Sequence, residues 1–206
     1  MITKSVFEMI KCKHGRYASW AVWGPQGATP KSGMADMTVF ETDAVLSVLK
    51  PNVVMLGLNL SKSIRLLPFG NFHAAESAQD YKIRYAFKDS EYYGAYMTDI
   101  IKVLEEIDST KVMNHLDAYP ELLADSLGIF REEMRDLGNS RPLILAFGES
   151  AYRLAYKYLE PEGYSGLVRL PHYSRRISQE GYKKLVFKQI AAHNDKQQYR
   201  AKESVK

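Results

Sequence analysis

Residues 52–61 of this chain read Asn-Val-Val-Met-Leu-Gly-Leu-Asn-Leu-Ser, an apolar run that stops at a glycine and passes into small polar residues. A short apolar run with β-branched residues is typical of a buried strand in a parallel sheet. Ligands of open α/β sheets bind just outside the carboxyl ends of such strands. Gly57, Leu58, Asn59 and Ser61 therefore mark a candidate site, although Gly, Asn and Ser are also common turn residues.

Three later segments repeat this pattern of an apolar strand followed by polar residues. They are residues 95–98, followed by Asp99; residues 142–148, followed by Glu149; and residues 165–170, followed by Pro171 and His172. Helical spacing or flanking breakers predict helices over 3–11, 40–49, 74–87, 119–137, 149–159 and 178–193. Strands that alternate with helices predict an α/β fold, a three-layer α/β/α arrangement around a four-stranded parallel sheet. Right-handed crossovers would bring all four strand ends to one edge of that sheet.

The composition is that of one ordinary globular domain. The chain has 206 residues, 46% of them hydrophobic, and a net charge of +4. We expect a single domain over residues 1–193 and a polar, frayed tail over 194–206. A lone cysteine, Cys12, and the lack of a secretory or membrane-spanning segment predict a soluble cytoplasmic protein, with a monomer favoured.

The polar residues at the strand ends suggest a ligand crevice. Asn59 could hold a water molecule or a substrate carbonyl, but its amide cannot act as a strong base. Asp99 could act as a base, accept a hydrogen bond from a ligand, or cap a helix. His172 could exchange a proton or stabilise a departing anion. An ordinary turn for Asn59 and a backbone-bonded loop histidine for His172 are the structural alternatives.

Other residues near the crevice suggest a nucleic-acid partner. Phe69 or Phe72 could stack on a planar base, and Arg175 and Arg176, after Ser174, could meet phosphates. A core anchor for the aromatic residues and a solvated charge pair for the arginines are the alternatives. The sequence has no Gly-rich phosphate loop, no Gly-x-Ser-x-Gly elbow and no Cys/His cluster with zinc-site spacing. We therefore expect neither a metal nor an organic cofactor.

Four pieces, in order, resemble motifs of the uracil-DNA glycosylase superfamily. Residues 54–61 are similar to its first motif, an apolar strand followed by Gly-x-Asn-Pro or a variant, and residues 96–102 to its Thr-Asn-x-x-Lys strand end. Residues 143–151 look like its Leu-Gly-x-x-Ala turn, and residues 170–175 resemble its final His-Pro-Ser-Pro motif. The resemblance covers roughly residues 51–190 and implies that superfamily's α/β/α fold.

The resemblance also implies a chemistry, because members flip a damaged base out of a duplex into a pocket. It assigns base stacking to Phe72, more than to Phe69, and positioning of the attacking water to Asn59. It assigns stabilisation of the leaving base to His172 and entry into the minor groove to the loop from Tyr173 to Arg176. Gly57, Leu58, Ser61 and Asp99 complete the implied substrate pocket, and Ser174, Arg175 and Arg176 the implied DNA-binding loop.

The chain departs from the superfamily pattern at three places. Leu60 stands where the family prefers Pro, the prolines after His172 are absent, and Asp99 replaces the Asn that reads the base. A carboxylate only accepts, so Asp99 suits an amino-bearing base or a ring N–H better than a uracil carbonyl. The leading hypothesis is a DNA glycosylase-like hydrolase, with a role in DNA repair, that acts on a damaged or mismatched base. A non-catalytic nucleic-acid or nucleotide binding protein and a small-molecule hydrolase are the alternatives.

Overall fold

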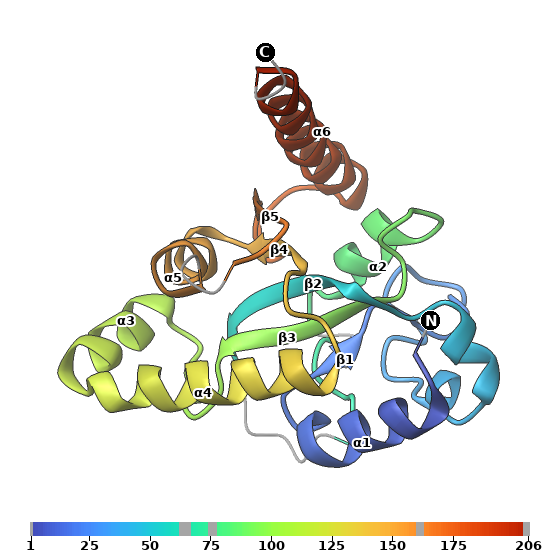
Figure 1. The fold of residues 1–206 in the computed structure, drawn as a ribbon. Coiled ribbons are helices and arrows are strands. Elements are labelled where there is room, and N and C mark those ends of the chain that lie inside the picture. Colours follow the sequence, from blue (N-terminus) through green and yellow to red (C-terminus); the bar gives the residue numbers. More distant parts are fainter. Residues whose placement is uncertain (1, 62–66, 74–77, 160–162, 204–206) are drawn as a thin grey trace.

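A computed structural model describes residues 2–61, 67–73, 78–159 and 163–203 of the chain. Its centre is a five-stranded sheet in the order β1-β3-β2-β4-β5 (Figure 1). The strands are β1 (Ser19–Trp20), β2 (Lys50–Asn59), β3 (Ala95–Ile101), β4 (Leu143–Phe147) and β5 (Gly166–Leu170). β2 pairs in parallel with β3 and β4, and β4 with β5, whereas β1 is antiparallel to β3.

The expected α/β fold and its four parallel strands are confirmed, but the sheet is mixed and has five strands. The extra strand, β1, comprises only Ser19 and Trp20 and pairs with Met97 and Tyr96 at the edge of the sheet. Its apolar sequence suited a strand, but nothing local showed that it joins this sheet or that it runs antiparallel. The prediction of a purely parallel, four-stranded sheet was therefore wrong on this point.

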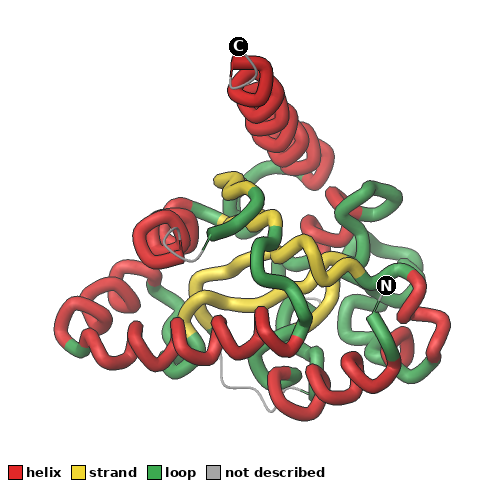
Figure 2. The backbone as a smooth tube through the Cα atoms, viewed as in Figure 1, coloured by secondary structure: helices red, strands yellow, loops and turns green. Residues whose placement is uncertain are grey.

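Helices cover both faces of the sheet, which lies between them in Figure 2. Alternation along β2 divides the core, because Val54 and Leu56 point to one face and Val53 and Met55 to the other. The first face is covered by α1 (Lys4–His14), α3 (Ser109–Ala118), α4 (Pro120–Asp136) and α5 (Glu149–Leu159). The second is covered by α2 (Tyr81–Phe87) and α6 (Gln179–Glu203). The inner strands β2, β3 and β4 are therefore covered on both faces, as their apolar sequences predicted, whereas Arg169 on the edge strand β5 is exposed.

The predicted helices differ from the structure in four places. Of the helix predicted over 74–87, residues 74–77 lie outside the described residues, and α2 begins only at Tyr81. Residues 40–49 do not form an α-helix: Thr42 is extended and separates the 3-10 helices η1 (Thr38–Phe40) and η2 (Asp43–Ser47). Helix α3 was not predicted, because it buries only Val112 and Leu116. Helix α6 was expected to end at His193 but continues to Glu203. Its C-terminal part extends away from the rest of the fold (Figure 1).

Within the described ranges, no helix is both long enough and apolar enough to cross a membrane.

Candidate active site

The carboxyl ends of β2, β3, β4 and β5 surround one cavity of about 600 Å³. Ligand pockets typically have volumes of about 300–1,000 Å³, so this one is large enough for a nucleobase with part of its sugar. The described residues that line it fall into three groups. From the end of β2 and the following loop come Leu58, Asn59, Leu60, Ser61, Gly70, Asn71 and Phe72. From the start of α2, from β3 and from the segment before α3 come Ala78, Gln79, Asp80, Asp99, Glu106, Ile107 and Ser109. From β4, α5 and the end of β5 come Phe147, Gly148, Glu149, Ser150, Ala151, His172, Tyr173 and Ser174.

Asp99 is the more deeply buried of the two buried acids in the cavity wall. Its side chain is 4% exposed, and burial raises the pKa of its carboxyl to about 7, against the hydrogen bond from Asn71 that lowers it. It lies within β3 and not beyond its end as predicted, because the strand continues through the buried Ile100 and Ile101. A carboxyl group with a pKa near 7 can act as a hydrogen-bond donor or as a base at physiological pH.

Asn71 holds Asp99 in place. Its Nδ2 donates to Asp99 Oδ2 at 2.9 Å and to the carbonyl oxygen of Tyr17 at 2.7 Å. Its Oδ1 accepts from the backbone N–H of Phe72 at 3.1 Å. The side chain thus ties three separate segments together, and its amide orientation follows from these partners.

Phe72 lies on a loop whose backbone is fixed by core residues. Phe69 and Phe72 both have positive φ angles, 67° and 63°, which are unfavourable for aromatic residues. Ser19 on β1 donates from Oγ to the carbonyl oxygen of Phe69 at 2.6 Å, and the buried His73 faces the carbonyl oxygen of Val22 through Nε2 at 2.8 Å. The short strand β1 therefore anchors the loop that presents Phe72 to the cavity.

The structure separates the two aromatic candidates. Phe69 is fully buried between Phe7 and Phe40, with ring centroids 5.3 Å from each, so it is a core residue. Phe72 is also buried, at 5% exposure, and packs in the core of the second face, but it lines the cavity as well. Its stacking on a base stays a prediction.

Gly57 provides the space in which Asp99 and Phe72 meet. It is opposite Asp99 in the parallel register of β2 and β3. A Cβ atom on Gly57 would lie 2.1 Å from Asp99 Oδ1 and 3.1 Å from Phe72 Cζ. Any larger residue would therefore displace the carboxyl group or the aromatic ring.

His172 stands after β5 at the mouth of the cavity. Its Nδ1 accepts from the backbone N–H of Ser174 at 3.2 Å and lies 2.8 Å from Ser174 Oγ. Since Nδ1 is an acceptor here, the neutral ring carries its proton on Nε2. His172 is exposed at the mouth, but partial desolvation of its ring lowers its pKa, which favours the neutral imidazole that can donate one hydrogen bond from Nε2.

Asn59 lines the cavity but uses its amide nitrogen for structure. Nδ2 donates to the carbonyl oxygens of Leu60, Leu104 and Glu106, at 3.1, 3.3 and 2.8 Å. The residue therefore links the end of β2 to the segment after β3. Only Oδ1 is left to accept a hydrogen bond from a ligand or water.

The exposed side of the cavity mouth carries basic residues. Ser174 lines the cavity, and Arg175 and Arg176 follow it as exposed residues of the same turn. Lys82 on α2 supports this turn by donating from Nζ to the carbonyl oxygen of Arg175 at 2.7 Å.

The structure thus brings together the residues predicted at the four strand ends. Leu58, Asn59, Ser61, Phe72, Asp99, His172 and Ser174 line one cavity, with Gly57 beneath it. Sequence reasoning missed Asn71 and Asp80, both buried in the wall. Asn71 adjoins Phe72, a predicted stacking residue, but no local signal showed that its amide reaches Asp99.

No group of three or more His, Cys, Asp or Glu side chains in the described part of the chain is arranged to hold a metal ion. Comparison with models of protein families, with curated proteins and with solved structures found no match to this chain.

Proposed function

We propose that this protein is a hydrolase that cleaves the N-glycosidic bond of a flipped base in nucleic acid, in the manner of a DNA glycosylase. The observation that carries the proposal is the cavity itself, in which an aromatic ring, a titratable acid and a neutral imidazole donor meet beside exposed arginines. The four motifs similar to the uracil-DNA glycosylase superfamily all border this cavity, which supports the proposal and the finer assignment of the fold.

In the proposed reaction, the base enters the cavity and stacks on Phe72 while Asp99 contacts its polar edge. The bond between the base and the sugar carbon breaks, and its electron pair leaves with the base. His172 Nε2–H donates a hydrogen bond to the resulting anion. Water then adds to the sugar carbon, with Asn59 Oδ1 accepting a hydrogen bond from it, and releases its proton to solvent. Arg175 and Arg176 contact phosphates of the strand.

The test is release of bases from oligonucleotides that carry uracil, hypoxanthine or a mismatch, in single and double strands. Removing one donor that stabilises a developing anion slows such reactions by about 10²- to 10³-fold, and we expect this loss for His172→Ala. His115→Ala is a matched control, because His115 is exposed on α3 and lies outside the cavity lining. Equal loss in both variants would contradict the assigned role of His172.

The hydrogen bonds of Asn59 favour a second candidate, a nucleic-acid binding protein without catalysis. Its amide nitrogen is committed to backbone carbonyls, so it contributes less to holding water than a free amide would. Salt-dependent DNA binding with no base release from any substrate would select this candidate. Affinity that does not change with salt would contradict both.

A further inference from the structure

The described residues that line the cavity and the residues exposed at its mouth carry charges of opposite sign. Its described lining residues include four carboxylates, Asp80, Asp99, Glu106 and Glu149, and neither lysine nor arginine. Glu149 pairs with Arg153 and Arg169 at 2.8 and 2.6 Å, and Glu106 Oε1 accepts from the N–H groups of Ile107 and Asp108. Two of the four, Asp80 and Asp99, are buried, at 7% and 4% exposure. The described part of the lining thus carries acidic and no lysine or arginine side chains, while Arg175 and Arg176 are exposed outside it.

The two oxygens of Asp99 have different surroundings. Oδ2 accepts the hydrogen bond from Asn71 Nδ2. Oδ1 lies over Gly57, and among the described residues no donor reaches it. Since Asp99 lines the cavity and its Oδ2 already accepts from Asn71, Oδ1 is the oxygen with capacity to accept a hydrogen bond from a bound ligand.

The direction of the Asn71 amide cannot be reversed without loss. Turning it over would place Oδ1 against the carbonyl oxygen of Tyr17 and the carboxylate of Asp99, and Nδ2 against the N–H of Phe72. Each contact would then join two acceptors or two donors. Asn71 is therefore a fixed donor to Asp99.

We propose that the cavity selects a base that presents an exocyclic amino group to Asp99 Oδ1 while its ring lies against Phe72. An ionised carboxylate only accepts hydrogen bonds, so an amino group satisfies Oδ1 and a carbonyl oxygen leaves two acceptors facing each other. In uracil and hypoxanthine the ring N–H is flanked by a carbonyl oxygen, which would meet Asp99 and the nearby charge of Asp80. The proposal rests on the proposed function for its substrate, and it names the bases that the site accepts.

Charged groups from three elements face Asp99 and set the conditions for a test. Asp80, at the start of α2, and Glu133, on α4, favour its protonated form, whereas Lys102, at the end of β3, favours its ionised form. The resulting pKa of about 7 means that Asp99 is ionised at pH 8.5, where the preference for amino groups should be fully developed.

The experiment compares two pairs of bases at pH 8.5: cytosine with uracil, and adenine with hypoxanthine. Each pair exchanges an amino group for a carbonyl group on the same ring. Binding is measured by calorimetry with the free bases and by competition with oligonucleotides that differ only at that base, and release is measured on the same oligonucleotides. We expect the amino-bearing member of at least one pair to bind about tenfold more tightly.

Asp99→Asn provides a sharper test, because Asn71 fixes which way the new amide would point. Its carbonyl oxygen would accept from Asn71 Nδ2, and its amide nitrogen would take the place of Oδ1. The cavity would then present a donor, so we expect the preference to reverse toward uracil or hypoxanthine. Asp117→Asn, at an exposed position of α3, is the matched control and should leave the preference unchanged.

The outcomes separate this inference from the proposed function. Free amino-bearing bases that bind preferentially, without DNA binding or base release, would support the inference and refute the proposed function. Base release with no preference, or with a preference for carbonyl-bearing bases in the wild type, would overturn the inference alone. If none of the four bases bound, either free or within an oligonucleotide, the inference would also be overturned. An unchanged preference in a folded Asp99→Asn variant would overturn it as well.

Discussion

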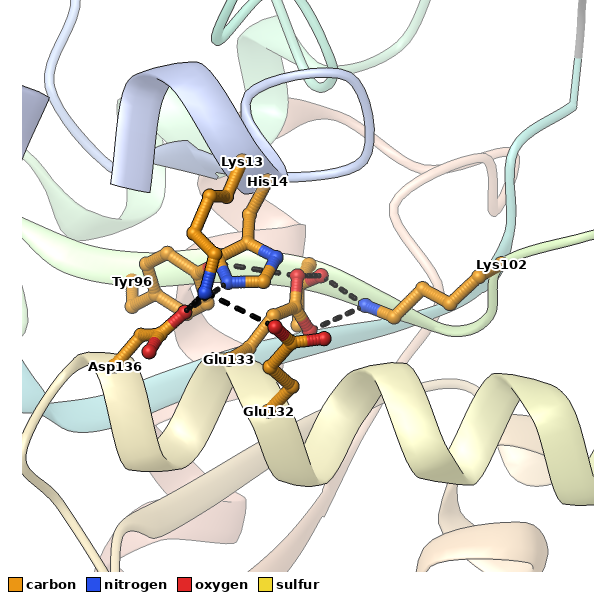
Figure 3. Close-up of polar contacts among 8 residues, drawn as sticks. Lys13, His14, Tyr96, Lys102, Glu132, Glu133 and Asp136 are labelled. Carbon is orange, nitrogen blue, oxygen red and sulfur yellow. Dashed lines mark hydrogen bonds and ion pairs between the residues drawn. The ribbon is translucent and has the colours of Figure 1, made fainter. Parts of the chain in front are cut away.

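Two buried carboxylates in this structure, Asp99 and Glu133, have opposite surroundings. Glu133 on α4 is fully buried and paired with Lys102 at 2.6 Å, while Thr98 and Tyr96 donate to its Oε1 at 2.9 and 3.1 Å (Figure 3). Asp99 lies only three residues before Lys102 and lines the cavity, and among the described residues its carboxyl group receives one hydrogen bond, from Asn71.

Glu133 and Asp99 are similarly buried but differ in their hydrogen-bond partners. Because every described partner of Glu133 comes from within the protein, its cluster joins α4 to β3 and is a structural element. Among the described residues, only Asn71 donates to the Asp99 carboxyl group, so its other oxygen can accept from a ligand or water in the cavity. The contrast supports the proposed ligand contact at Asp99 and a structural role at Glu133.

The largest effect should come from breaking the satisfied cluster. Lys102→Ala leaves Glu133 as an uncompensated buried charge, and loss of one partner of a buried pair costs about 3–5 kcal/mol of stability. Chemical denaturation would measure the free energy of unfolding. Lys13→Ala is the control, because Lys13 pairs with Glu132 and Asp136 on the exposed side of the same helix (Figure 3) and should leave stability close to that of the wild type. An equally stable Lys102→Ala variant would contradict a structural role for the cluster.

The next largest effect is on the pH dependence of the free energy of unfolding, through Asp99. The folded-state pKa of Asp99, about 7, lies above its ordinary value of 3.8, so the folded protein binds a proton more tightly than the unfolded chain. The stability contributed by this group is fully present below about pH 3.8 and is lost as the pH rises to about 7. Asp99→Asn removes this loss, so its stability relative to the wild type should grow over that range, by on the order of 4 kcal/mol, and level off above it. Thermal unfolding of the wild type and of Asp99→Asn from pH 4 to pH 8 measures the difference in stability; a difference that does not grow over this range would contradict the assignment.

The smallest of the three effects on stability comes from filling the space beneath Asp99. Gly57→Ala would place a methyl group 2.1 Å from Asp99 Oδ1, and such overpacking costs about 1–3 kcal/mol. We also expect it to abolish binding of any base that requires Oδ1. Gly128→Ala on α4 is the matched control: no atom lies within 4 Å of its added Cβ, and alanine should stabilise this exposed helical position by up to about 1 kcal/mol. Unchanged ligand binding in Gly57→Ala would place the ligand elsewhere.

Much of the fold and of the site followed from local patterns. The apolar runs at Val53, Ala95, Leu143 and Gly166 all became strands of the parallel part of the sheet, because such runs are stable only when covered on both faces. Asn59, Asp99 and His172 came to one cavity because parallel connections bring strand ends to the same edge. The function assigned to them remains a proposal.

The amino-acid sequence by itself determined the α/β class, the parallel strands and the edge at which polar side chains gather, since these depend on hydrophobic spacing and chain connectivity. Tertiary structure alone decided that β1 joins the sheet, that Asn71 contacts Asp99, and which oxygen of that carboxyl group Asn71 engages. It also decided that Phe72 and not Phe69 lines the cavity, although both rings are buried. These features depend on contacts between segments far apart in the chain, and no local pattern of residues encodes the distance or the direction of such a contact.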